Sequence, residues 1–127
     1  MSRILSFENP IIISENVFRD KVWNVFGKAI IERQDLVLDF RNVKFIVSTV
    51  IPKLCCLGEI GKKAGIDLEI IPGTKLAIYL AEMDFWRIAS LNNIFSFDEK
   101  YLDFSFLNKK VTTALFCIEK EALKHKY

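Results

Sequence analysis

Apolar runs with strand character alternate along this chain with segments whose apolar residues recur every three or four positions. Strands are expected at 4–13 (with a turn at 8–10), 35–40, 43–47, 66–71 and 92–97, and helices at 14–34, from Ser48, at 75–86 and at 111–124. Within the last of these segments, TTALFCI (112–118) is also compatible with a strand. Alternation of this kind is typical of α/β sandwiches. We therefore expect one α/β domain over residues 1–127, built on a mixed β-sheet.

Serine and glycine positions predict how the first two long helices begin, pack and end. Ser14 is a good N-cap for the helix that follows it. Gly27 lies inside that helix, where a close crossing with a neighbour would explain it. Gly58 and Gly61 are expected to permit close packing of the helix that starts at Ser48, and Gly65 to end it.

Composition narrows the function classes. Hydrophobic residues make up 51% of the 127 residues and charged residues 27%, which excludes a disordered chain. The net charge is +2 and the basic residues are interleaved with acids, so we expect no nucleic-acid partner. No uncharged apolar run approaches the roughly 18 residues of a membrane span. We expect a soluble, cytoplasmic protein without a signal peptide or a membrane partner.

The residues that usually carry catalysis or bind metal are sparse. The single histidine is His125, close to the C-terminus, so serine and cysteine nucleophiles lack a plausible base. Cys55, Cys56 and Cys117 form neither a CxxC motif nor a disulfide framework, and are expected to be free thiols in a reducing cytosol. We expect no metal site, no cofactor and no enzymatic activity.

The stretch Val-Ser-Thr-Val-Ile-Pro (47–52), between an expected strand and an expected helix, is the best candidate site. Ser48 or Thr49 can cap the helix, with Pro52 in its first turn. The same helix N-terminus can hold an anion, and either hydroxyl can accept a phosphate. Capping is the simplest interpretation, and it is compatible with phosphorylation of the other hydroxyl.

The stretch DLVLDFRNVKFIVSTVIPKLCCLGEIGKKAGIDLEII (35–71), followed by LAIYLAEMDFWRI (76–88), resembles the STAS domain of sulfate transporters and anti-sigma factor antagonists. The resemblance covers about half of the chain and implies a STAS-like sandwich with helices mainly on one face of the sheet. It places the phosphoacceptor at Thr49, with Ser48 as the first hydroxyl. Val47 replaces the acid of that family's Asp-Ser-Ser-Gly motif and Val50 replaces its glycine.

The resemblance implies a non-enzymatic regulatory module that docks a cytosolic partner, such as a serine-kinase-like (histidine-kinase-like) ATPase, with a degenerate phospho-switch. Docking is expected through the start of the helix and the strand before it, at Val47, Val50, Ile51 and Lys53. One alternative is a non-switching scaffold or homodimer with Phe85, Trp86 and the segment 95–106 at its interface, although large aromatic side chains are more often core. Another is a small-molecule or nucleotide-binding domain that uses the helix N-terminus.

Overall fold

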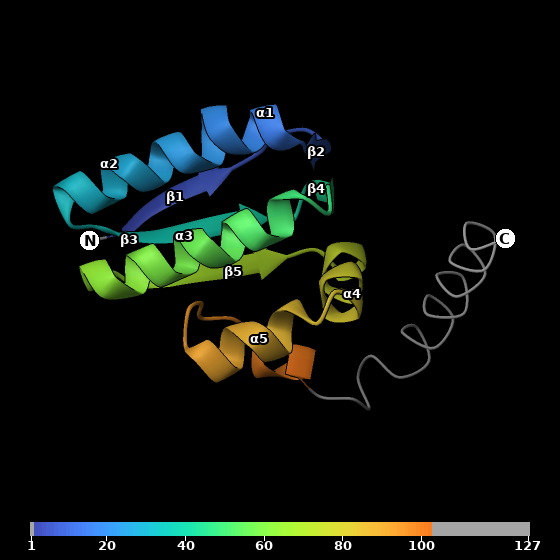
Figure 1. Cartoon of the computed structure of the whole chain (residues 1–127). Coiled ribbons are helices and arrows are strands. Elements are labelled where there is room, and N and C mark those ends of the chain that lie inside the picture. The colour runs from blue at the N-terminus through green and yellow to red at the C-terminus, as the bar shows by residue number, and fades with distance from the viewer. Residues whose placement is uncertain (1, 103–127) are drawn as a thin grey trace, which may run out of the picture.

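Strand and helix alternate along residues 2–102, the part of the chain that the computed structural model describes (Figure 1). The elements in chain order are β1 (Ser2–Ser6), β2 (Ile11–Ile13), α1 (Glu15–Val17), the π-helical segment η1 (Phe18–Trp23), α2 (Asn24–Glu32), β3 (Asp35–Phe40), β4 (Val43–Ile46), α3 (Val50–Ala64), β5 (Leu68–Pro72), α4 (Thr74–Glu82), α5 (Phe85–Asn92) and the 3-10 turn η2 (Glu99–Leu102). The α/β class is confirmed. The expected helix at 111–124 lies outside the described residues.

The paired strands are all parallel within residues 2–102. One sheet has the order β1-β3-β5, and β2 pairs with β4 in a second, two-stranded ladder. The expectation of a mixed sheet is therefore wrong for this part of the chain. Helical crossovers follow β2, β4 and β5, and such crossovers return the chain to the same end of the sheet, which gives parallel neighbours.

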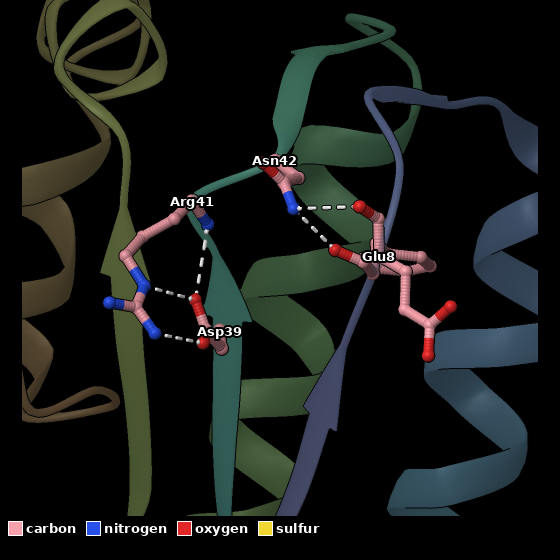
Figure 2. Close-up of polar contacts among 5 residues, drawn as sticks. Glu8, Asp39, Arg41 and Asn42 are labelled. Atoms are coloured by element: carbon pink, nitrogen blue, oxygen red, sulfur yellow. Dashed lines mark hydrogen bonds and ion pairs between the residues drawn. The ribbon is translucent and has the colours of Figure 1, made fainter.

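A short interruption separates β1 from β2 and, beside it, β3 from β4. The Asn42 side-chain amide spans this gap and donates to the carbonyl oxygens of Phe7 at 2.6 Å and Glu8 at 3.4 Å (Figure 2). Next to it, the Arg41 guanidinium donates to both carboxylate oxygens of Asp39, at 2.9 and 2.7 Å. These side chains satisfy polar groups where the strand ladders are broken.

The core lies between one face of the sheet and the helices. Leu36, Leu38 and Phe40 alternate along β3 with half-buried residues and have no exposed surface. Figure 1 shows α2 and α3 in front of the strands, and both helices contact this sheet. The buried side chains of residues 2–102 are all hydrophobic. No helix in this part of the chain is both long and apolar enough to cross a bilayer.

Three of the four glycine predictions agree with the structure. A Cβ on Gly61 would lie 2.6 Å from a methyl carbon of Leu68 in β5, and one on Gly58 would lie 2.9 Å from Ile94 Cβ, so α3 packs closely at both. Gly65 ends α3 with φ +78°, a backbone conformation that favours glycine. The close crossing expected at Gly27 is wrong, because nothing lies within 4 Å of a Cβ there.

The expected helix at 75–86 is two helices. Asp84 has φ +62° and separates α4 from α5, and its carboxylate pairs with Arg87. Thr74 is the first residue of α4, and Gly73 is its N-cap. The expected strand at 92–97 is reduced to an isolated parallel bridge between Ser96 and Glu69.

The aromatic residues after α4 belong to the core. Phe85 and Trp86 are 0% and 1% exposed, and the Trp86 indole N–H donates to the carbonyl oxygen of Ala77 at 2.9 Å. Phe95 is 8% exposed and packs on Phe85, with ring centroids 5.7 Å apart. The core interpretation of these three residues is confirmed, which removes them from the interface expected for a homodimer. Residues 103–106 of that interface lie outside the described part.

Candidate docking surface

The strand-to-helix junction is a tight turn that opens α3. The Val50 N–H donates to the Val47 carbonyl at 2.9 Å and the Ile51 N–H to the Ser48 carbonyl at 3.3 Å. Pro52 has no N–H to offer. These first positions of the helix therefore have no unused N–H group for an anion, which weighs against the nucleotide-binding alternative at this site.

Thr49 occupies the N-cap position but its hydroxyl does not cap the helix. Its backbone is helical, with φ −69° and ψ −18°, and its side chain makes no hydrogen bond to the first turn. An N-cap side chain usually reaches those N–H groups from an extended backbone. The capping interpretation is therefore wrong for Thr49. Ser48 and Thr49 are both exposed.

The Thr49 side chain instead interacts with the carboxylate of Glu15, at the start of α1, and contributes, after Lys53, to lowering the pKa of that carboxyl. The same carboxylate forms an ion pair with Lys53, one turn further along α3. The Lys53 ammonium, and after it the Thr49 hydroxyl, hold the pKa of Glu15 below its usual range. The start of α1 and the start of α3, which are far apart in the sequence, are thus in contact through these side chains.

A pocket of about 350 Å³ adjoins this ion pair, lined by Glu15, Phe18, Arg19, Trp23 and Lys53. Three of these residues come from η1, whose wider π-helical turn is a feature often found at functional sites. We refer to Thr49 together with these five lining residues as the junction surface. It combines charged groups of both signs with an apolar wall.

Trp23 is the most exposed part of that apolar wall, with 42% of its surface open to solvent. Its indole packs on Phe18 and Phe26, at centroid distances of 6.3 and 5.5 Å. An exposed tryptophan held by neighbouring rings has the character of a binding hot spot. Trp23 was not predicted from the sequence, because helical periodicity does not show which aromatic side chain of a helix is exposed.

The four residues expected to dock a partner fall into two groups. Val50 and Ile51 are 0% and 7% exposed and belong to the core, so their side chains are not available to a partner in this structure. Lys53 is exposed and Val47 is half-buried. The residues of the junction that have exposed surface are therefore Val47, Ser48, Thr49, Pro52 and Lys53, and not the two buried aliphatic residues.

Besides Trp23, two apolar residues that pair across β2 and β4 are exposed near the junction. Ile12 of β2 and Phe45 of β4 are register partners, 51% and 39% exposed. Phe45 packs against Tyr79 of α4, with ring centroids 4.6 Å apart. Phe45 lies on β4, the strand that leads into the junction, and Ile12 lies on its neighbour β2. The sequence could not place this pair, because the short apolar runs Ile11–Ile13 and 43–47 do not show which side faces solvent.

The remaining reactive groups of the described residues do not gather into a site. Cys55 and Cys56 are free thiols, and burial, with smaller contributions from Cys56 and Glu59, raises the pKa of the Cys55 thiol. A raised pKa disfavours the nucleophilic thiolate. No group of three or more histidine, cysteine or acidic residues within 2–102 could hold a metal ion. Cys117 and His125 lie outside this part of the chain.

The structure defines a small α/β domain with a parallel sheet and a mixed polar and apolar surface at one strand-to-helix junction. No protein-family model matches the chain, and no curated protein or solved structure matches it either.

Proposed function

We propose that this chain is a non-enzymatic regulatory module, a divergent STAS-like domain that docks a cytosolic protein through the junction surface. The observation that carries the proposal is that Thr49 is exposed at the start of α3, where the ion pair of Lys53 and Glu15 lines a pocket together with an exposed tryptophan, Trp23. Polar groups around an aromatic anchor are typical of protein interfaces. A serine-kinase-like ATPase is the partner class that the resemblance in sequence implies.

The geometry supports a phosphorylation switch at Thr49 that does not need the acid and the glycine of the Asp-Ser-Ser-Gly motif, which Val47 and Val50 replace in this chain. A phosphate on Thr49 would add about −1.5 to −2 charges. It would be repelled by Glu15 and attracted by Lys53, so the existing ion pair would be lost. Arg19, which now pairs with Asp20 at 2.9 Å, is the other cation of the surface. Phosphorylation would therefore change the charge pattern that the partner meets without altering the core.

Photo-crosslinking in cells that naturally produce the chain tests the proposal. A photoreactive amino acid replaces Trp23 in one variant of the full chain and Ile31 in the control. Ile31 is also on the helical side of the domain and 82% exposed, but it lies at the far end of α2. Crosslinked proteins are identified by mass spectrometry.

We expect a serine-kinase-like ATPase to be crosslinked from position 23 and not from position 31, and Lys53→Glu to abolish the product. Three outcomes would contradict the proposal: no product at position 23, equal yields at both positions, or a product that contains only two copies of this chain. The last outcome would favour the homodimer alternative.

A further inference from the structure

One face of the β1-β3-β5 sheet has no helix of residues 2–102 packed on it. Ile4, Val37 and Glu69 are register partners across the three strands and point to this face, opposite to the buried Leu36 and Leu68. Ile4 is 65% exposed and Glu69 is exposed. We call this side of the three strands the open face.

An open face is unusual for a sheet of this kind. Parallel sheets occur almost only where both faces are covered, because each crossover places a helix on one of them. Here α2 and α3 are on the same side, and Gly58 of α3 contacts the segment that follows α5, so α5 adjoins them on that side too. A second layer on this face would have to come from another part of the chain or from another molecule.

The last described residues lie next to the open face. Lys100 and Tyr101 of η2 line a pocket together with Glu69 and Ile71 of β5, and Ile71 points to the open face. Leu102, the last described residue, is 44% exposed. Residues 103–110 can span roughly 25 Å when extended, which is more than the width of three strands at about 5 Å each.

We propose that the segment 111–124 covers the open face. Its residues Val111, Leu115, Ile118 and Ala122 recur at helical spacing, and a helix of this length is about 21 Å long, enough to cross the three strands.

The charges of the open face favour the segment 111–124 as its cover over the open face of a second copy of the chain. The face carries Asp35, Asp39 and Glu69, with Arg41 paired to Asp39. The lysines of residues 103–127 are Lys109, Lys110, Lys120, Lys124 and Lys126, and the acids are Asp103, Glu119 and Glu121. Two acidic faces would repel each other. Within 111–124 two lysines and two acids balance, and the excess of lysines lies at Lys109, Lys110 and Lys126, which flank the segment, so its two ends are attracted to the acidic face.

Crosslinking through Cys117 tests the proposal in the full chain. Cys55→Ser and Cys56→Ser leave Cys117 as the only native thiol, and a second cysteine is then introduced as Ile4→Cys or, for the control, as Ile31→Cys. Both isoleucines are exposed, at 65% and 82%, so neither change should disturb folding. A short bifunctional maleimide joins the two thiols.

We expect a crosslink within one chain to form about tenfold faster with Ile4→Cys than with Ile31→Cys, because packing raises the local concentration of Cys117 at the open face. Equal rates would overturn the proposal. Products that join two chains at Ile4→Cys would overturn it as well, and would assign the face to a second copy.

Hydrogen exchange provides an independent measurement without cysteines. In the full chain, Ile4→Lys should speed amide exchange in 111–124, and Ile31→Lys should leave it unchanged. Exchange in 111–124 that is the same in the parent chain and in both variants would contradict the proposal.

Discussion

Ser14 and Thr49 stand at the N-cap positions of two helices and use their hydroxyls in different ways. The Ser14 hydroxyl accepts a hydrogen bond from the Val17 N–H at 3.3 Å, from an extended backbone with ψ 177°. The Thr49 hydroxyl is turned to Glu15, and its helical backbone keeps it away from the first turn of α3. The same chemical group thus caps the first turn of one helix and leaves the first turn of the other without a side-chain cap.

Alanine substitution should separate these two roles. Ser14→Ala should lower the free energy of unfolding by about 1 kcal/mol, because one N–H at the helix start loses its acceptor. Thr49→Ala should lower it by less than about 0.5 kcal/mol, as for other exposed positions. Urea denaturation of both variants measures the difference. Equal losses would show that Thr49 caps α3 after all.

The ion pair between Lys53 and Glu15 should be visible in the titration of Glu15. Because Lys53 is the main cause of the lowered pKa, Lys53→Met should raise the pKa of Glu15 towards its ordinary value of about 4.3. Carboxyl carbon NMR across pH measures it, with Lys63→Met, on the same helix, as control. An unchanged pKa in Lys53→Met would contradict the pairing.

The sign of the linked stability effect follows from the lowered pKa. The pair stabilises the fold above the pKa that Glu15 has in the unfolded chain, and this contribution is lost as the pH falls through the lower pKa of the folded state. The parent chain and Lys53→Met should therefore differ near neutral pH and converge in acid. The exposure of both side chains makes the effect small.

At the scale of elements, two helical glycines should respond to alanine with opposite signs. Gly27 of α2 has open space where a Cβ would stand, so Gly27→Ala should stabilise the protein by about 0.5–1 kcal/mol. Gly58→Ala should destabilise it by about 1–3 kcal/mol, because its Cβ would approach the Phe95 ring to 2.8 Å.

Urea denaturation of these two glycine variants provides the measurement, and each serves as the control for the other. Changes of the same sign would contradict the packing described for α3.

The sequence predicts elements better than it predicts their limits. Hydrophobic periodicity located the strands at 35–40 and 66–71 and the helix after Ser14, because these patterns reflect burial on one or both sides. The break at Asp84 has neither glycine nor proline to mark it, since an aspartate adopts the left-handed conformation there. The π-turn at η1 likewise leaves the apolar spacing almost intact.

The sequence indicates the strand-to-helix junction itself, but not the residues from elsewhere in the chain that adjoin it. At the junction, Ser48, Thr49 and Pro52 are exposed, whereas Val50 and Ile51 are buried. Its partners Glu15 and Trp23 come from a distant segment, and their contact with the junction depends on the pairing of β2 with β4, which no local pattern encodes.

At the scale of the whole molecule, the parallel direction of the strands could not be predicted from the sequence, because it depends on the path of every crossover. The parallel direction of β2 and β4 matters for the junction surface, because it brings the start of α1 beside the start of α3. The junction surface is the product of that topology.

A charge at Thr49 tests the account most directly. Thr49→Glu places a carboxylate beside Glu15 on the junction surface, whereas Thr74→Glu places one at an exposed threonine that begins α4. Isothermal titration calorimetry measures the affinity of each full-length variant for the protein crosslinked from position 23, and a thermal melt verifies that each variant is folded.

We predict that Thr49→Glu weakens binding at least about tenfold, or about 1.4 kcal/mol, while its thermal midpoint stays close to that of the parent chain and Thr74→Glu binds normally. An unchanged affinity in Thr49→Glu, or an equal loss in Thr74→Glu, would contradict docking at the junction surface.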